Sequence, residues 1–196
     1  MKSHRIGERI VVSRSGDRWM ATISGAIPDW QRQSLEIWLG AWMALGAMLI
    51  YGAWSFPGGE RQFYLICMGF WAFFAMRGWK AVRWRRSGQE VVQLSQDGLS
   101  IRLDHGEQPG KTTEAALHVL MPAEAPAPNP KSFLESMDQQ FWVVGGDRIQ
   151  VGTETKTLVF GKQLEAKDAS QLVTLFNKHL AQLKTCLLYT SPSPRD

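Results

Sequence analysis

Residues 106–113, GEQPGKTT, come closest to a motif with known chemistry, because a phosphate-binding loop ends in a similar glycine-lysine-threonine run. In such a loop, backbone amides and the lysine hold the phosphates of a nucleotide. The full motif also needs a glycine at position 105, where the chain has His105, and no clear strand-loop-helix pattern surrounds it. The spacing therefore favours a connecting turn between strands over a nucleotide site.

The other residue types that do chemistry are scattered along the chain. Zinc sites need Cys or His ligands at short intervals, whereas the histidines lie far apart, at His4, His105, His118 and His179. Turns and the start of a helix account for three aspartates, Asp97, Asp147 and Asp168. We therefore expect no catalytic residue, cofactor or metal ligand and predict a non-enzymatic protein. A membrane-associated enzyme of unknown reaction is the least favoured alternative.

Two long apolar segments are the strongest signal in the sequence. The chain is 44% hydrophobic with a mean hydropathy of −0.19, but its apolar residues are concentrated between Leu35 and Trp84. Residues 35–56 are long enough as a helix to span about 33 Å. Residues 63–76 are shorter and reach a similar length only with the following RGWKAVRW. With the turn predicted at 57–62, PGGERQ, these segments indicate a two-helix transmembrane hairpin.

Aromatic and basic residues give this hairpin an orientation. Four tryptophans lie near the predicted helix ends, where membrane interfaces favour them: Trp38, Trp54, Trp79 and Trp84. Basic residues are dense before and after the hairpin, but its turn has only Arg61, so we expect both termini in the cytoplasm. Four basic residues at the exit could also contact anionic lipid headgroups: Lys80, Arg83, Arg85 and Arg86.

The net charge of +4 comes largely from these juxtamembrane residues and predicts no nucleic-acid partner. The lipid bilayer is the first expected partner. A membrane or cytoplasmic protein is the second. Small residues at Gly40 and Ala44 would also let a second helix approach closely, which keeps a homo-oligomer open.

The flanking regions show strand and turn patterns instead. Residues 8–25 and 90–104 each suggest a β-hairpin, the second around Asp97-Gly98 with a type I′ turn. A third strand is expected at 115–121, although its alanines leave a helical turn open, and a Pro-rich loop follows at 122–138. Further strands are expected at 140–146, 148–153 and 155–160, and the apolar spacing of 164–183 predicts an amphipathic helix that closes the sheet.

The order of these elements resembles that of uncharacterised bacterial membrane proteins with a pleckstrin-homology-like (PH-like) domain. The resemblance rests on the basic exit RRSGQEVVQLSQDGLSIR, the late strands GGDRIQVGTETKTLVFGKQL and the terminal helix. It implies a small β-roll capped by a helix, in the bacterial inner membrane, without implying an activity. In architecture alone, the layout is also similar to a photosystem I assembly protein family with two N-terminal spans.

The last residues, 186–196, resemble a translated sequencing adapter, CLLYTSPSPRD, which places the natural C-terminus beyond Thr185 outside this sequence. Without them, Cys67 is the one cysteine, so no disulfide framework is expected.

The sequence thus predicts an α+β membrane protein in which a transmembrane hairpin is followed by an antiparallel PH-like β-roll and a C-terminal amphipathic helix. The expected division is a cytoplasmic N-terminal segment at 1–33, the hairpin and its basic exit at 34–86, a cytoplasmic PH-like domain at 87–185, and a non-native tail. The expected function is that of a membrane-anchored interaction or scaffold module. An anionic-phospholipid-binding module is the alternative.

Overall fold

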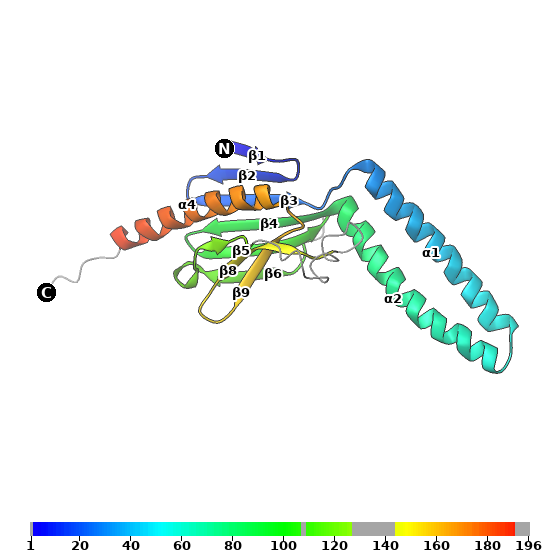
Figure 1. The fold of residues 1–196 in the computed structure, drawn as a ribbon. Helices are drawn as coiled ribbons and strands as arrows, with labels where there is room; N and C mark the ends of the chain where they lie inside the picture. The colour runs from blue at the N-terminus through cyan, green and yellow to red at the C-terminus, as the bar shows by residue number, and fades with distance from the viewer. Residues whose placement is uncertain (1, 107–108, 127–143, 191–196) are drawn as a thin grey trace. The chain divides into compact units, whose positions relative to one another are not determined.

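The structure is a computed structural model that describes residues 2–106, 109–126 and 144–190 (Figure 1). The chain divides into two compact units. One unit contains two long helices, α1 (Asp29–Ser55) and α2 (Gly59–Ser87). The other contains two antiparallel sheets and the last helix, α4 (Ala166–Thr190). We call the first the helical hairpin and the second the β-domain.

The larger sheet has six strands that follow one another in chain order. They are β1 (Lys2–Ile6), β2 (Ile10–Ser15), β3 (Arg18–Ser24), β4 (Gly88–Ser95), β5 (Gly98–His105) and β6 (Thr112–Ala116). A 3₁₀ turn, η1 (Leu117–Val119), leads to a smaller sheet of β7 (Ala123–Glu124), β8 (Asp147–Gly152) and β9 (Thr157–Lys162). The α+β class is confirmed, as are the N-terminal β-hairpin, formed by β2 and β3, and the late strands β8 and β9.

The helical hairpin is inserted between two neighbouring strands of one sheet. β3 pairs with β4 from Trp19↔Leu94 to Ser24↔Gln89, although both helices lie between them in the sequence. The pairing extends to the Gly25 amide, which donates to the Gly88 carbonyl at 2.8 Å. Half of the larger sheet therefore precedes the helical hairpin, and the N-terminal β-hairpin predicted at 8–25 belongs to the same sheet as the strands that follow α2.

The core of the β-domain lies beneath α4, which contacts β1 of the larger sheet and β7 and β8 of the smaller one. The buried face of α4 has the predicted three- and four-residue spacing and is at most 3% exposed, at Ala169, Leu172, Phe176, Leu180 and Leu183. Phe176 meets Trp19 edge-on at 5.6 Å between ring centroids and Phe160 at 6.0 Å. One helix thus closes both sheets, as expected, and it continues past Thr185.

Two details of the larger sheet correct the sequence prediction. Ser95 pairs with Gly98, so the β4–β5 turn is Gln96-Asp97, and neither residue has the positive φ of a type I′ turn. Gly98 is needed for another reason. Its φ is +138°, and a Cβ there would overlap the Ala115 carbonyl oxygen of β6. Glycine at this position therefore lets the neighbouring strand approach closely.

The strand expected at 115–121 lies earlier in the chain, at Thr112–Ala116, and the helical turn that remained open for this segment is η1. Leu117 and Leu120 are both 2% exposed. Residues three apart point to opposite faces of a strand, so only a helical turn can bury both. The Pro-rich loop at 122–138 contains β7 at its start. Most of the loop, and residues 140–143 of the strand predicted at 140–146, lie outside the described residues.

In the helical hairpin, both helices are longer than the apolar runs that predicted them. Only Phe56, Pro57 and Gly58 separate α1 from α2, so the turn expected at 57–62 is shorter. Gly58 has φ +71° and ends the connection. Glu60 lies in the first turn of α2, where a negative charge is favourable.

Candidate functional site

The loop that resembled a nucleotide-binding motif forms a connection within the larger sheet. The Gly110 amide donates to Asp104 Oδ1 at 3.1 Å, and Arg102 pairs with the same carboxylate at 2.8 Å. β6 begins at Thr112, where a phosphate-binding loop would start a helix. The predicted connecting turn is confirmed for the described residues on either side of 107–108.

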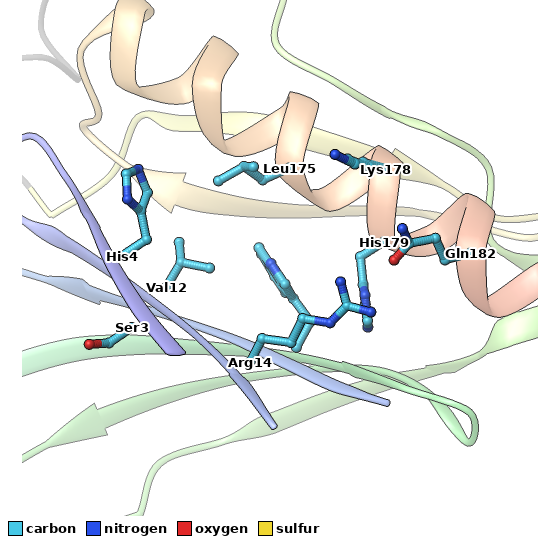
Figure 2. A pocket seen from close by; sticks show the side chains of 9 residues that line it. Ser3, His4, Val12, Arg14, Leu175, Lys178, His179 and Gln182 are labelled. Carbon is cyan, nitrogen blue, oxygen red and sulfur yellow. The ribbon is translucent and has the colours of Figure 1, made fainter. Parts of the chain in front are cut away.

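A groove of about 480 Å³ opens on the β-domain between α4 and the first three strands (Figure 2). Its apolar part is formed by Val12 on β2, Trp19 on β3 and Leu175 on α4. Its polar part comes from β1, β2 and α4: Ser3, His4, Arg14, Lys178, His179 and Gln182. None of these lining residues is acidic. We call this site the basic groove.

Alternation along β2 places an arginine in the groove. Ile10, Val12 and Arg14 share one face of the strand, and the first two are buried in the core. Arg14 is opposite Trp19 in the sheet register, and Trp19 is 3% exposed. The face covered by α4 is therefore apolar at one end of β2 and cationic at the other.

On the helix side, Lys178 and His179 differ in their electrostatic role. The Lys178 side chain is on the exposed side of α4 and reaches the mouth of the groove in Figure 2. His179 is 3% exposed, with Nε2 3.3 Å from the Asp17 carbonyl oxygen. Burial lowers the pKa of the His179 imidazole, which favours its neutral form near pH 7. Arg14 and Lys178 therefore supply the fixed positive charge.

The sequence pattern did not predict this groove. His4 and His179 are far apart in the sequence, but the fold brings β1 and α4 to one site, while His105 ends β5 and His118 lies in η1. In the described parts of the chain, no cluster of three His, Cys, Asp or Glu side chains could hold a metal ion. The one sign of the groove in the sequence was Arg14, which lies on the same face of its strand as the apolar Ile10 and Val12.

A second cavity, of about 340 Å³, lies between the two sheets and contains the buried carboxyl of Glu90. Glu90 is 1% exposed, and its Oε2 accepts hydrogen bonds from the Gly161 and Lys162 amides at 2.8 and 3.2 Å. Burial raises the pKa of this carboxyl to about 7, while the two amides oppose the rise. Lys162 pairs with Asp147 at 3.0 Å.

Arg9 strengthens the same junction. Its guanidinium donates to the carbonyl oxygens of Ser24 and Gln163 at 2.8 Å each and to that of Lys162 at 3.2 Å. Burial lowers the pKa of Arg9, and the charge of Glu90 opposes that change. Because these polar groups have hydrogen-bond or ion-pair partners within the β-domain, their simplest role is to hold the two sheets together.

The predicted interface tryptophans do not share one environment. Trp54 is 91% exposed, Trp79 61% and Trp38 44%, whereas Trp84 is 2% exposed. Among the basic residues at the end of α2, Lys80, Arg83 and Arg86 are exposed and Arg85 is buried. Arg86 pairs with Glu36 of α1 at 3.3 Å. The basic exit is therefore partly engaged within the helical hairpin.

The two helices pack through glycines and paired indoles. A Cβ at Gly46 would overlap the Trp71 ring, and one at Gly52 would overlap Tyr64. Trp42 Nε1 donates to the Trp71 carbonyl oxygen at 3.1 Å, and Trp71 Nε1 donates back to the Trp42 carbonyl at 2.6 Å. Both indole donors are thereby satisfied inside the pair.

No protein-family model matches the chain, and comparison with curated proteins found no match.

Proposed function

We propose that this protein is a non-enzymatic, membrane-anchored interaction module that presents its β-domain to a partner and helps assemble a membrane complex. The insertion of the helical hairpin between β3 and β4 carries this proposal. Helices of 27 and 29 residues are long and apolar enough to cross a membrane, and only 17% and 22% of their most apolar windows are buried. A core helix of a soluble domain would be largely buried.

The sheet pairing supports a common side for both flanks of the helical hairpin. β1 to β3 precede α1 and β4 to β9 follow α2, yet β3 and β4 are hydrogen-bonded neighbours. Such pairing requires an even number of membrane crossings between them. Because Arg61, in the first turn of α2, is the only Lys or Arg between Arg32 and Arg77, the positive-inside rule favours the cytoplasm for both flanks, with both termini there, at a bacterial inner membrane.

The arrangement of the β-domain is consistent with the PH-like roll that the sequence resemblance implies. Two antiparallel sheets enclose a core, and one C-terminal helix contacts both. Folds of this kind serve many functions, so this likeness supports a binding scaffold without indicating what it binds.

Recognition of anionic phospholipid headgroups is the second candidate. Exposed Lys80, Arg83 and Arg86 on the last turns of α2 favour it, because cations close to a membrane surface each contribute about 1 kcal/mol of attraction to acidic lipids. The burial of Arg85 reduces the predicted cluster by one residue.

Crosslinking of the full chain in its native membrane, followed by mass spectrometry, tests the first proposal. A reproducible stoichiometric protein partner is expected. Recovery of a monodisperse monomer alone would contradict it. In parallel, the chain with Lys80, Arg83 and Arg86 changed to Gln should keep the protein partner. Loss of lipid crosslinks alone, with no protein recovered from either chain, would instead favour headgroup recognition.

A further inference from the structure

The basic groove lies beside an open sheet edge. β1 pairs with β2 from Lys2↔Arg14 to Ile6↔Ile10, and within the described residues no strand pairs with its other edge. Such an edge presents backbone donors and acceptors to which another extended chain can add as a strand. β1 also supplies Ser3 and His4 to the groove. The edge and the groove are therefore available to one ligand.

The groove restricts the side chains of such a ligand. The apolar part of the lining consists of half-buried Leu175 above the buried Val12 and Trp19, and it favours an aliphatic or aromatic side chain. Arg14 and Lys178 lie around it on opposite sides, from β2 and α4 (Figure 2). With no acidic side chain in the lining, an anionic ligand is electrostatically favoured over a cationic one.

We propose that the basic groove and the β1 edge bind a short extended acidic peptide segment of a partner protein, with one apolar side chain placed against Leu175 and flanking carboxylates paired with Arg14 and Lys178. This inference deepens the proposed interaction function and depends on it for the origin of the segment. The sheet edge favours a peptide over a lipid headgroup, because only a peptide backbone can continue the ladder of β1.

The test uses the full chain in phosphatidylcholine nanodiscs and a fluorescent peptide with one phenylalanine between two pairs of glutamates. Fluorescence anisotropy should show saturable binding. A peptide with lysines in place of the glutamates should not bind. A version with N-methylated backbone at alternate residues should bind at least about tenfold more weakly, since it lacks ladder donors.

Paired charge variants locate the binding site. Arg14→Glu with Lys178→Glu should weaken binding at least about tenfold, equivalent to a loss of about 1.4 kcal/mol. Arg18→Glu with Lys167→Glu makes the same change in net charge at exposed positions outside the groove and should leave binding unchanged. The single change Lys178→Glu, on the exposed side of α4, guards against misfolding and should have an intermediate effect.

Three results would overturn the inference. The first is no saturable binding to the wild-type chain, and the second is equal weakening by the two double variants. The third is displacement of the peptide by phosphatidylglycerol vesicles but not by phosphatidylcholine vesicles, which would assign the groove to anionic lipid. If native-membrane crosslinking still gives a stoichiometric partner in these cases, the interaction function stands and only this site is wrong.

Discussion

The helical hairpin exposes large apolar side chains of the kind that the β-domain buries. Phe160 and Phe176 of the β-domain are fully buried, whereas Phe70 of α2 is 68% exposed and Met48 of α1 is 70% exposed. Large exposed apolar residues are concentrated between Trp30 and Trp79; the exceptions among the described residues are Val11, Met121, Val144 and Val159. The β-domain thus buries its large apolar side chains in a core, whereas the helical hairpin leaves them on its surface, as we expect of helices that span a membrane.

The two regions also satisfy their polar groups differently. In the β-domain, two backbone amides of β9 donate to the buried Glu90 carboxyl. In the helical hairpin, Trp42 and Trp71 exchange indole-to-carbonyl hydrogen bonds across the helix pair. The first arrangement joins two sheets, and the second joins two helices without exposing a donor to an apolar surrounding.

Removing most of the helical hairpin should have the largest effect, because it removes the unit that exposes apolar side chains. Leu39 lies close to Gly78, so a short glycine- and asparagine-rich loop can replace residues 40–77 while the cluster of Leu35, Leu39, Ala81 and Val82 remains. We expect this chain to move from the membrane fraction to the soluble fraction and to retain β-rich circular dichroism. Deletion of 29–58 alone should prevent folding, because a single crossing would separate β3 from β4. Soluble, folded protein from this one-helix chain would contradict the insertion topology.

Truncation of the aromatic core should have the largest effect of any single substitution. Phe176→Ala removes the ring that contacts both Trp19 and Phe160 and should lower the free energy of unfolding by about 3–5 kcal/mol. Urea unfolding in detergent, followed by near-ultraviolet circular dichroism, measures the change. Gln171→Ala on the exposed side of α4 is the control and should change stability by less than about 0.5 kcal/mol.

The buried carboxyl of Glu90 predicts a pH dependence confined to the β-domain. Its pKa is about 7 in the folded chain and near 4.5 when unfolded, so between these pH values the folded state holds a proton that the unfolded state has released. This contribution to stability is complete below about pH 4.5 and is lost as the pH rises through 7, by about 3 kcal/mol in total.

Glu90→Gln should remove this fall, measured as the difference in unfolding free energy between the variant and the wild type across that pH range. Glu154→Gln, at an exposed position, is the matched control. An unchanged pH profile in Glu90→Gln would show that another group carries the dependence.

A small change within the helical hairpin should have the smallest effect. Gly46→Ala places a methyl group against the Trp71 ring and should destabilise the helix pair by about 1–3 kcal/mol. Gly40→Ala is the matched control, since no atom outside its own helix lies within 4 Å of a Cβ at that position. Thermal unfolding of the full chain in detergent compares the two. Equal stability of both variants would mean that Trp71 moves aside without cost.

The sequence by itself determined the elements whose signals are local and repeated. Uniform apolarity identified α1 and α2, and three- and four-residue spacing identified α4, because the apolar faces of a helix must be buried in a protein core or in lipid. Alternating residues located β2, β3, β4, β5 and the late strands. The resemblance of residues 90–104 to a hairpin was right in its pairing, while the turn lay one residue earlier than Asp97-Gly98.

Only the tertiary structure decided what depends on distant residues. Gly98 is glycine because β6 passes against it, and residues 117–120 form a turn because Leu117 and Leu120 both reach the core. The pairing of β3 with β4 across 26–86 and the meeting of β1 with α4 in the basic groove are likewise non-local. The alternation of one strand states which face a side chain occupies, but the partner opposite that face is set by how the whole chain packs.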